Sequence, residues 1–245
     1  MTRVLAAMAT AVVMVLGAPA LVAAQGQQLD LNVEGLGRVS APLQIVLLLT
    51  LLSFLPAILV TMTSFTRIVI VLHFVRQALG TQDMPSNQIL IGLSLFLTAF
   101  IMAPVGERIN GIAVQPMMAG SIAVDEAISR GSGPLREFML KQTRQADLAL
   151  FNDLAKLPKP NAPEDLSMRV VVPAYVISEL KTAFQMGFFL FVPFLLIDLV
   201  VSTTLLSMGM LQLPPAMVSL PFKILLFVMI DGWNLLVGSI VRSFL

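Results

Sequence analysis

Residues 182–210 read TAFQMGFFLFVPFLLIDLVVSTTLLSMGM, with Asp198 as the only charged side chain. This run is longer than the roughly 20 apolar residues that one membrane-spanning helix needs. The chain then turns at Pro214-Pro215 and returns through residues 216–240, which are almost as apolar. The last third of the chain, residues 170–245, is therefore predicted to be a long apolar helical hairpin.

A second apolar hairpin is predicted over residues 42–106. Residues 45–62 and 84–106 contain no charged side chain, and Pro56 predicts a kink in the first of these stretches. Residues 65–79, between them, are apolar but carry basic side chains. This segment either extends the first helix or lies at the membrane interface with its cations near lipid headgroups.

The composition places the chain among all-α membrane proteins. It is 57% hydrophobic and 12% charged, with a mean hydropathy of +0.91, whereas a soluble domain carries about 25% charged residues. The formal net charge of +1 argues against a nucleic-acid partner, which requires a concentrated basic face. With no Cys and one His, the chain has no residue set for disulfides, thiol chemistry or a multi-histidine metal site, and no cofactor is expected.

The first 24 residues are typical of a secretory signal peptide. Arg3 supplies the positive start, residues 4–16 form the apolar region, and Val22-Ala23-Ala24 offers small residues for cleavage. The alternative is a first transmembrane helix, for which the apolar run is short. Cleavage leaves residues 25–41 as a short polar exported N-terminus.

Residues 107–169 change character, since acidic and basic side chains return in similar numbers. Gly131-Ser132-Gly133-Pro134 predicts a break, with Pro134 placed to begin a helix. Apolar residues at helical spacing then predict an amphipathic helix over 135–157. We expect a small, water-exposed helical domain between the two hairpins.

Membrane topology follows from signal cleavage and four spans. Residue 25 lies outside, residues 65–87 lie on the cytoplasmic side, and residues 107–169 and the C-terminus lie outside. Arg67 and Arg76 in the inner segment agree with the positive-inside rule. Residues 107–169 therefore form an exported domain.

The turn at 207–215 contains no charged residue, although a turn in contact with cytosol is normally polar. Irregular backbone at membrane depth requires burial in protein or a cavity to line. One interpretation is a tight interhelical turn whose methionines pack. The other is a soft constriction in a pore, because methionine is flexible and adapts to varied shapes. The candidate residues are Met208, Met210, Leu211 and Gln212.

Charged side chains within the apolar helices form a second group of candidate functional residues. A charge in an apolar helix is unfavourable unless it is paired or lies in a wet cavity. Acids and bases are nearly balanced, which favours pairing within or between subunits, while conduction of ions or protons remains the alternative. The set comprises Glu179, Lys181, Asp198, Lys223, Asp231 and Arg67.

Catalysis is not expected. Asp198 and Asp231 on separate apolar helices resemble an intramembrane aspartyl protease pair only superficially, since the Tyr-Asp and Gly-x-Gly-Asp patterns of that class are missing. The sequence also lacks a Gly-x-Ser-x-Gly elbow, a His-Glu-x-x-His pair and a P-loop.

Two blocks of sequence resemble the FliP/SctR family of type III secretion export-gate proteins. The first runs from Leu52-Ser53-Phe54-Leu55-Pro56-Ala57 through Thr63-Ser64-Phe65-Thr66-Arg67 to Pro85-Ser86-Asn87-Gln88. The second begins at Pro173-Ala174-Tyr175 and continues through Glu179-Leu180-Lys181, Pro214-Pro215 and Leu220-Pro221-Phe222-Lys223 to Asp231-Gly232-Trp233. The signal peptide and the sizeable exported domain are similar to those of the flagellar members.

The resemblance implies a homo-oligomer that assembles with FliQ and FliR, and with FlhB and FlhA nearby, into a helical, ring-like gate. Unfolded flagellar subunits would pass through this gate in the bacterial inner membrane, at the flagellar basal body. It also implies that a methionine-rich loop seals the pore and that Phe138, Phe151 and Glu179 serve subunit assembly. This chain departs from the family's run of methionines, because Leu211 and Gln212 follow Met210.

Two other classes of protein remain as alternatives to the protein-conducting channel. A small-solute or ion transporter would use the buried charges and act from this chain alone. A membrane scaffold without a conduit would give the methionine turn no role beyond packing. The family resemblance also implies that apolar helices can lie within a protein complex above the bilayer.

Overall fold

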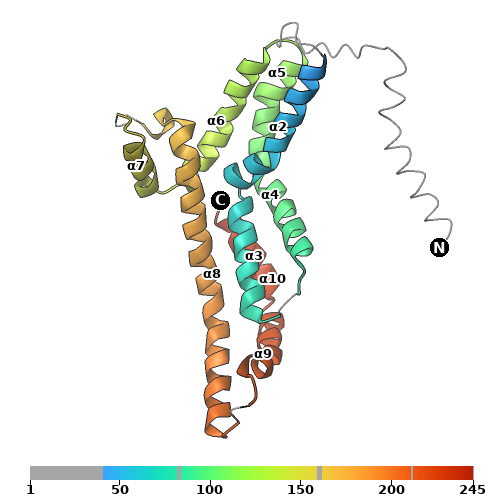
Figure 1. Ribbon diagram of the computed structural model, residues 1–245, viewed down its shortest axis with the longest axis vertical. Coiled ribbons are helices and arrows are strands. Elements are labelled where there is room, and N and C mark those ends of the chain that lie inside the picture. The colour runs from blue at the N-terminus through green and yellow to red at the C-terminus, as the bar shows by residue number, and fades with distance from the viewer. Residues whose placement is uncertain (1–40, 82–83, 159–161, 211, 245) are drawn as a thin grey trace, which may run out of the picture. The chain divides into compact units, whose positions relative to one another are not determined.

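The computed structural model describes residues 41–81, 84–158, 162–210 and 212–244, and every regular element in these ranges is a helix (Figure 1). The predicted signal peptide and residues 25–40 lie outside the described residues. Contacts divide the chain into two units, 1–53 and 54–245. The architecture below is that of the second unit, while the described part of the first is the beginning of helix α2.

Helix α2 spans Ala41–Met62, and the chain bends by 78° before α3, Phe65–Leu79. Residues 65–79 therefore do not extend the first helix in a straight line. A residue distant in the sequence stabilises this bend, because the Tyr175 hydroxyl donates a hydrogen bond of 2.9 Å to the carbonyl of Thr63. Gly80, with a φ of 73°, ends α3 in the left-handed conformation that glycine adopts readily.

Helix α4, Asn87–Ile109, returns along α3 and continues through the π-helical turn η1, Asn110–Val114, into α5, Gln115–Met118. Residues 87–118 form one of two helical stretches that are long and apolar enough to cross a membrane. The other is α8, Met168–Ser207. Each of the bent pairs, 56–79 and 215–242, can be counted as a further span, which gives up to four within the described residues.

The predicted helix break at residues 131–134 is wrong. Helix α6 runs from Val124 to Gln142 through this segment, and α7 follows over Gln145–Leu154. The break lies instead at Thr143, whose ψ of 135° is extended. Gly131 and Pro134 are buried where α6 packs against α4 and η1, so packing outweighs the local preference of these residues for a turn.

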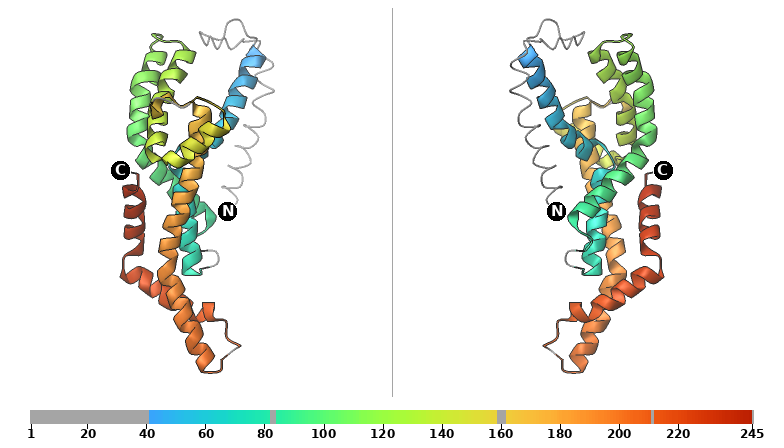
Figure 2. Two further views of the ribbon diagram at one scale, coloured as in Figure 1. Left: turned by 90° about the vertical axis from the view of Figure 1, so that its left-hand side faces the viewer. Right: turned by 90° about the vertical axis from the view of Figure 1, so that its right-hand side faces the viewer.

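Helix α8 has 40 residues and is about 60 Å long, twice the thickness of a bilayer's hydrocarbon core. The Ser167 side chain caps its first turn by accepting a hydrogen bond from the Arg169 N–H. Helix α3 lies along α8 in the views of Figures 1 and 2. Gly187 permits this close approach, because a Cβ there would lie 2.4 Å from the ring of Phe74.

The predicted return through residues 216–240 is helical but bent. The return consists of α9, Pro215–Met229, and α10, Gly232–Arg242, which meet at 64° (Figure 2). Asp231 between them adopts a left-handed conformation with a φ of 51°. Gly232 packs directly on the Phe227 ring, since a Cβ there would lie 2.3 Å from ring atoms. This contact fixes the bend that hydropathy alone does not reveal.

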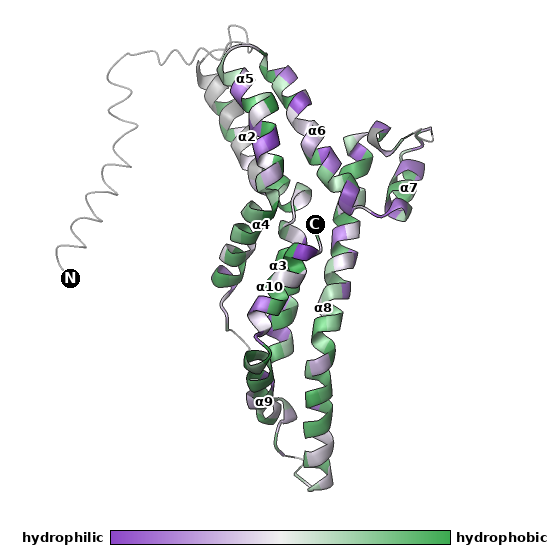
Figure 3. Ribbon diagram, turned by 180° about the vertical axis from the view of Figure 1, so that it is seen from behind, coloured by the Kyte–Doolittle hydropathy of each residue, from purple (hydrophilic) through white to green (hydrophobic). Residues whose placement is uncertain are grey.

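Two clusters of buried apolar residues hold the second unit together. The larger one joins α3, α4, α8, α9 and α10, and the smaller one joins α6, α7 and the start of α8. Figure 3 shows hydrophilic residues gathered on α6 and α7, whereas hydrophobic residues dominate α4, α9 and the end of α8. Many apolar side chains on the latter elements are exposed, as expected for a protein that contacts lipid or other subunits.

Candidate functional site: buried ion pairs and an exposed apolar turn

Arg67 of α3 and Glu179 of α8 form an ion pair in the interior. The Arg67 Nε donates to Glu179 Oε2 at 2.8 Å, and Nη2 donates to the other carboxylate oxygen, which makes the pair bidentate. Arg67 is 2% exposed and Glu179 is fully buried. The planar guanidinium suits this two-point contact better than an ammonium group does.

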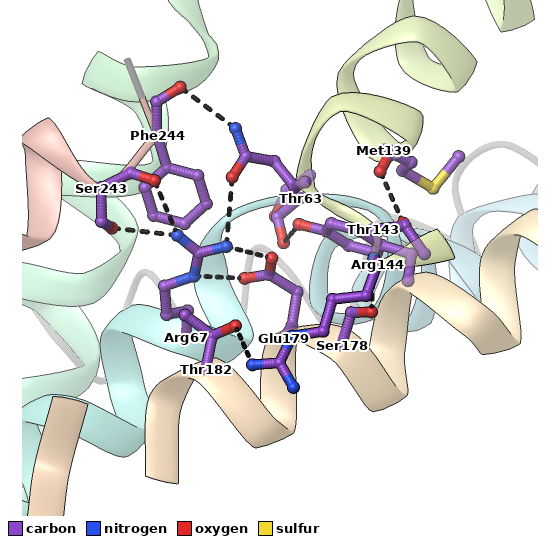
Figure 4. A network of polar contacts seen from close by, with 12 residues as sticks. Thr63, Arg67, Met139, Thr143, Arg144, Ser178, Glu179, Thr182, Ser243 and Phe244 are labelled. Carbon is purple, nitrogen blue, oxygen red and sulfur yellow. Dashed lines mark hydrogen bonds and ion pairs between the residues drawn. The ribbon is translucent and has the colours of Figure 1, made fainter. Parts of the chain in front are cut away.

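The remaining N–H groups of Arg67 reach two further elements (Figure 4). Nη1 donates to the carbonyl and the hydroxyl of Ser243, at 3.0 and 2.9 Å, and Nη2 donates to Gln142 Oε1 at 3.2 Å. The guanidinium carbon lies 3.8 Å from the centre of the Phe244 ring. One arginine thus connects α3, α6, α8 and the segment after α10.

The burial of the Arg67 charge is tolerable because every N–H group of the guanidinium has a hydrogen-bond acceptor. A buried ion pair compensates for lost hydration only when its geometry is good and its other hydrogen-bonding groups have partners. The burial of Arg67 also corrects, for this residue alone, the alternative that the cations of residues 65–79 lie near lipid headgroups. Arg67 is inside the protein, and Arg76 is half-buried with a hydrogen bond of 2.6 Å to the Asn87 side chain.

A second ion pair joins α8 to α9. The Lys223 Nζ lies 2.6 Å from Asp198 Oδ2, and the Ser219 hydroxyl donates to Asp198 Oδ1 at 2.6 Å. Lys223 is 4% exposed, whereas the Asp198 side chain is 32% exposed. A Cβ at Gly80 would lie 3.8 Å from the ammonium, so Lys223 is also adjacent to the C-terminal end of α3, where a helix dipole favours a cation.

The other two candidates for buried pairs are not buried. Lys181 is exposed on α8, and Asp231 is exposed between α9 and α10, where it accepts a hydrogen bond of 3.1 Å from Asn234. Neither forms an ion pair with any residue that the structure describes. Four of the six residues therefore form ion pairs, and three of these four, Arg67, Glu179 and Lys223, are buried.

The charge-free turn begins at the end of α8. Met208 is 62% exposed and Met210 is 43% exposed, with Gly209 between them at a φ of 75°. Gln212 is exposed as well, while Leu211 lies outside the described residues. Beside the turn, α8 and α9 enclose an apolar pocket of about 550 Å³ lined by residues such as Val200, Leu205 and Phe222.

Phe138 and Phe151 pack within this chain. Phe138 lies between the rings of Tyr175 and Phe244, with centroid distances of 6.1 Å to each. Phe151 packs against the cluster that includes Met139 and Tyr175. Both side chains remain half-exposed, so surface is left for a further contact.

Several residues of these networks carry no signal in the sequence. Gln142 and Ser219 are uncharged, and Ser243 and Phe244 lie at the end of the chain, so neither charge nor spacing distinguishes them. Tyr175 is the chain's only tyrosine, and a buried tyrosine usually finds a hydrogen-bond partner. The single tyrosine therefore indicates that its hydroxyl has a hydrogen-bond acceptor, but the sequence does not identify this acceptor as the carbonyl of Thr63.

The fold and these contacts define a helical protein whose apolar helices are compatible with membrane insertion and whose buried charges join the helices. Comparison with known proteins identifies the family. The sequence model of the FliP family matches residues 48–240, and the chain belongs to that family. The family is a structural component of flagellar export and not an enzyme family.

Named relatives are similar over most of the chain. A flagellar biosynthetic protein FliP from Bacillus subtilis is 58% identical over 206 residues, covering 84% of this chain and 93% of its own. The protein of that name from Pectobacterium carotovorum is 57% identical, covering 82% of this chain and 78% of its own. One from Caulobacter vibrioides is 48% identical over 242 residues, covering 98% of this chain and 89% of its own.

Proposed function

We propose that this chain is a core subunit of the flagellar type III export gate. Several copies would assemble with FliQ and FliR into a channel that passes unfolded flagellar subunits across the bacterial inner membrane. FlhB and FlhA are the expected neighbours, and residues 107–169 would form the periplasmic domain. Membership of the FliP family supports the role in export, and the assembly with these partners is our proposal.

The observation that carries the channel proposal is the exposed apolar turn at the end of α8. In the single chain, Met208 and Met210 are exposed although they are apolar, and they follow a helix whose last turns are exposed as well. A ring of copies would bring such turns together and bury them. Flexible apolar side chains exclude water when packed and have no directional bonds to break when a substrate displaces them.

The proposal is tested by replacing Met210 and Leu211 together with alanine. The complex should still assemble, because Met210 is exposed in the single chain, but the resting barrier should weaken. We expect faster leakage of potassium and of a small fluorescent solute from cells that carry the variant, compared with wild type at equal abundance of the complex. Gln212→Ala should leak less than the double variant.

The control removes the same two side-chain types from exposed positions elsewhere. Met118 is 81% exposed and Leu154 is 66% exposed, and both lie outside the turn. Met118→Ala with Leu154→Ala should leave leakage unchanged. An unchanged barrier in the turn variant, with the complex shown to be present, would mean that the turn only packs. Ion flux from this chain alone, without FliQ and FliR, would support the transporter alternative instead.

A further inference from the structure

An apolar pocket lies where α4, α6 and the end of the chain meet. It has a volume of about 440 Å³. Its apolar lining includes Phe100, Ile101, Pro104 and Val105 of α4, together with Phe138 and Phe244. Phe100 is 65% exposed, so this part of the surface offers a large ring to an apolar ligand.

A second pocket of about 690 Å³ shares part of this lining and is strongly basic. The two pockets have Arg108, Pro134, Glu137 and Lys141 in common, and they are therefore adjacent. The charged lining of the second pocket consists of Arg108, Arg130, Arg136, Lys141 and one acid, Glu137.

The ion pairs in the basic pocket leave an excess of positive charge. Glu137 is shared between Arg108 and Lys141, at 2.7 and 3.0 Å, and its hydrogen bonds to these cations, Arg108 first, hold its pKa at about 2. Arg130 pairs with Glu126 of its own helix at 2.5 Å. Arg108 and Lys141 share the one carboxylate of Glu137, so the basic pocket carries an excess of positive charge and favours an anion.

We infer that the two pockets together form a binding site for an anionic phospholipid. Along α4 the lining changes from apolar at residues 100–105 to cationic at Arg108, which is the order of acyl chain and phosphate in a phospholipid. The change falls within residues 87–118, a stretch long and apolar enough to span a membrane. Basic residues at the edge of a hydrocarbon layer attract anionic headgroups.

The apolar lining of the first pocket and the basic lining of the second together determine which class of ligand fits. A free phosphate would use the cations and leave the apolar pocket empty, whereas a zwitterionic lipid would fill the apolar pocket without neutralising the excess charge. An anionic lipid with one phosphodiester, such as phosphatidylglycerol, satisfies both parts. The inference goes beyond the proposed export function and does not depend on it.

The test uses the full-length protein, extracted with its co-purifying subunits, and native mass spectrometry. Phosphatidylglycerol, phosphatidylcholine and inorganic phosphate are the three probes. We expect phosphatidylglycerol to be retained over phosphatidylcholine and to resist competition by phosphate. Equal retention of the two lipids, or displacement by phosphate at matched concentration, would overturn the inference.

The basic part is tested by Arg108→Gln with Lys141→Gln, both of which are more than half exposed. Each basic residue near an anionic headgroup contributes about 1 kcal/mol, so the double variant should bind phosphatidylglycerol at least about tenfold more weakly. Arg108→Lys with Lys141→Arg should keep the binding. Arg169→Gln with Lys181→Gln removes the same charge from exposed positions outside both pockets and should have no effect.

The apolar part is tested by Phe100→Ser, which should weaken lipid binding. Phe96→Ser is the matched control, because Phe96 lies one turn earlier on α4, is 72% exposed and does not line either pocket. Equal effects of the two serine variants would overturn the assignment of the acyl-chain position. Loss of oligomer with unchanged lipid binding in the Arg108 and Lys141 variant would show that the pockets hold a neighbouring subunit instead.

Discussion

Two parts of α8 have different surroundings: residues 168–194, the first half, and residues 195–207, the shorter second half. From Val170 to Phe194, buried side chains recur along the helix, and Glu179 is among them. From Leu195 to Ser207 every side chain is exposed or half-exposed. Leu206 near the end is 68% exposed. The first half is therefore the central support of the single chain, and the second half has apolar surface still to be covered.

This difference separates two roles for apolar residues in one helix. In the first half they pack with α3, α6 and α7 and stabilise the subunit. In the second half, Asp198 forms an ion pair with Lys223 and accepts a hydrogen bond from Ser219, both of α9. Substitutions in the first half should destabilise the chain itself, whereas substitutions in the second half should act on assembly or sealing.

The largest effect is expected for Glu179→Ala in the first half. It leaves the Arg67 guanidinium buried without its carboxylate, and breaking such a pair costs about 3–5 kcal/mol. Thermal unfolding of the detergent-extracted protein, together with the yield of the oligomer, measures the loss. We expect the oligomer to decrease more than the expression level does.

Lys181→Ala is the matched control, because Lys181 lies two residues further along α8 and is exposed. Its effect on unfolding should be within about 0.5 kcal/mol. If the two variants unfold alike, the Arg67 network does not support the fold as we describe it.

A smaller effect is expected for Lys223→Ala in the second half. Asp198 keeps its hydrogen bond from Ser219 and is 32% exposed, so water can solvate the carboxylate that remains. The free energy of unfolding should fall by about 1–3 kcal/mol. Unfolding of the purified protein is compared with that of Glu179→Ala under the same conditions. A loss as large as that of Glu179→Ala would contradict the contrast between the two halves.

The smallest effect concerns an ion pair outside α8. The pKa of Glu137 is held at about 2, below its usual 4.5, chiefly by its hydrogen bond to Arg108. A lowered pKa means that the ionised carboxylate stabilises the fold above about pH 4.5 and that this contribution disappears as the pH falls towards 2. The difference in melting temperature between wild type and Glu137→Gln should be small at neutral pH and vanish as the pH falls from about 4.5 to 2.

Because the pair of Glu137 with Arg108 is exposed, high salt at neutral pH should remove most of this difference in melting temperature. A difference that persists in high salt and at pH 2 would contradict this account.

Part of the functional site could be predicted from the sequence. A charged residue within an apolar stretch needs a partner, and this reasoning identified four residues that form two ion pairs, Arg67 with Glu179 and Lys223 with Asp198. It could not tell them from Lys181 and Asp231, because exposure depends on which face of a helix meets a neighbour. Gln142 and Ser243, which complete the Arg67 network, carry no charge to reveal them.

The sequence by itself determined that the chain is helical and apolar and where its charge-free segments lie, because hydropathy is a property of consecutive residues. Only the tertiary structure decided where the helices bend. Tyr175 holds the bend after α2, and Phe227 packs on Gly232 at the bend after α9. It also brought Arg67 to Glu179, which is 112 positions away. Such contacts depend on the packing of whole helices against one another, and the local pattern around each residue does not contain that information.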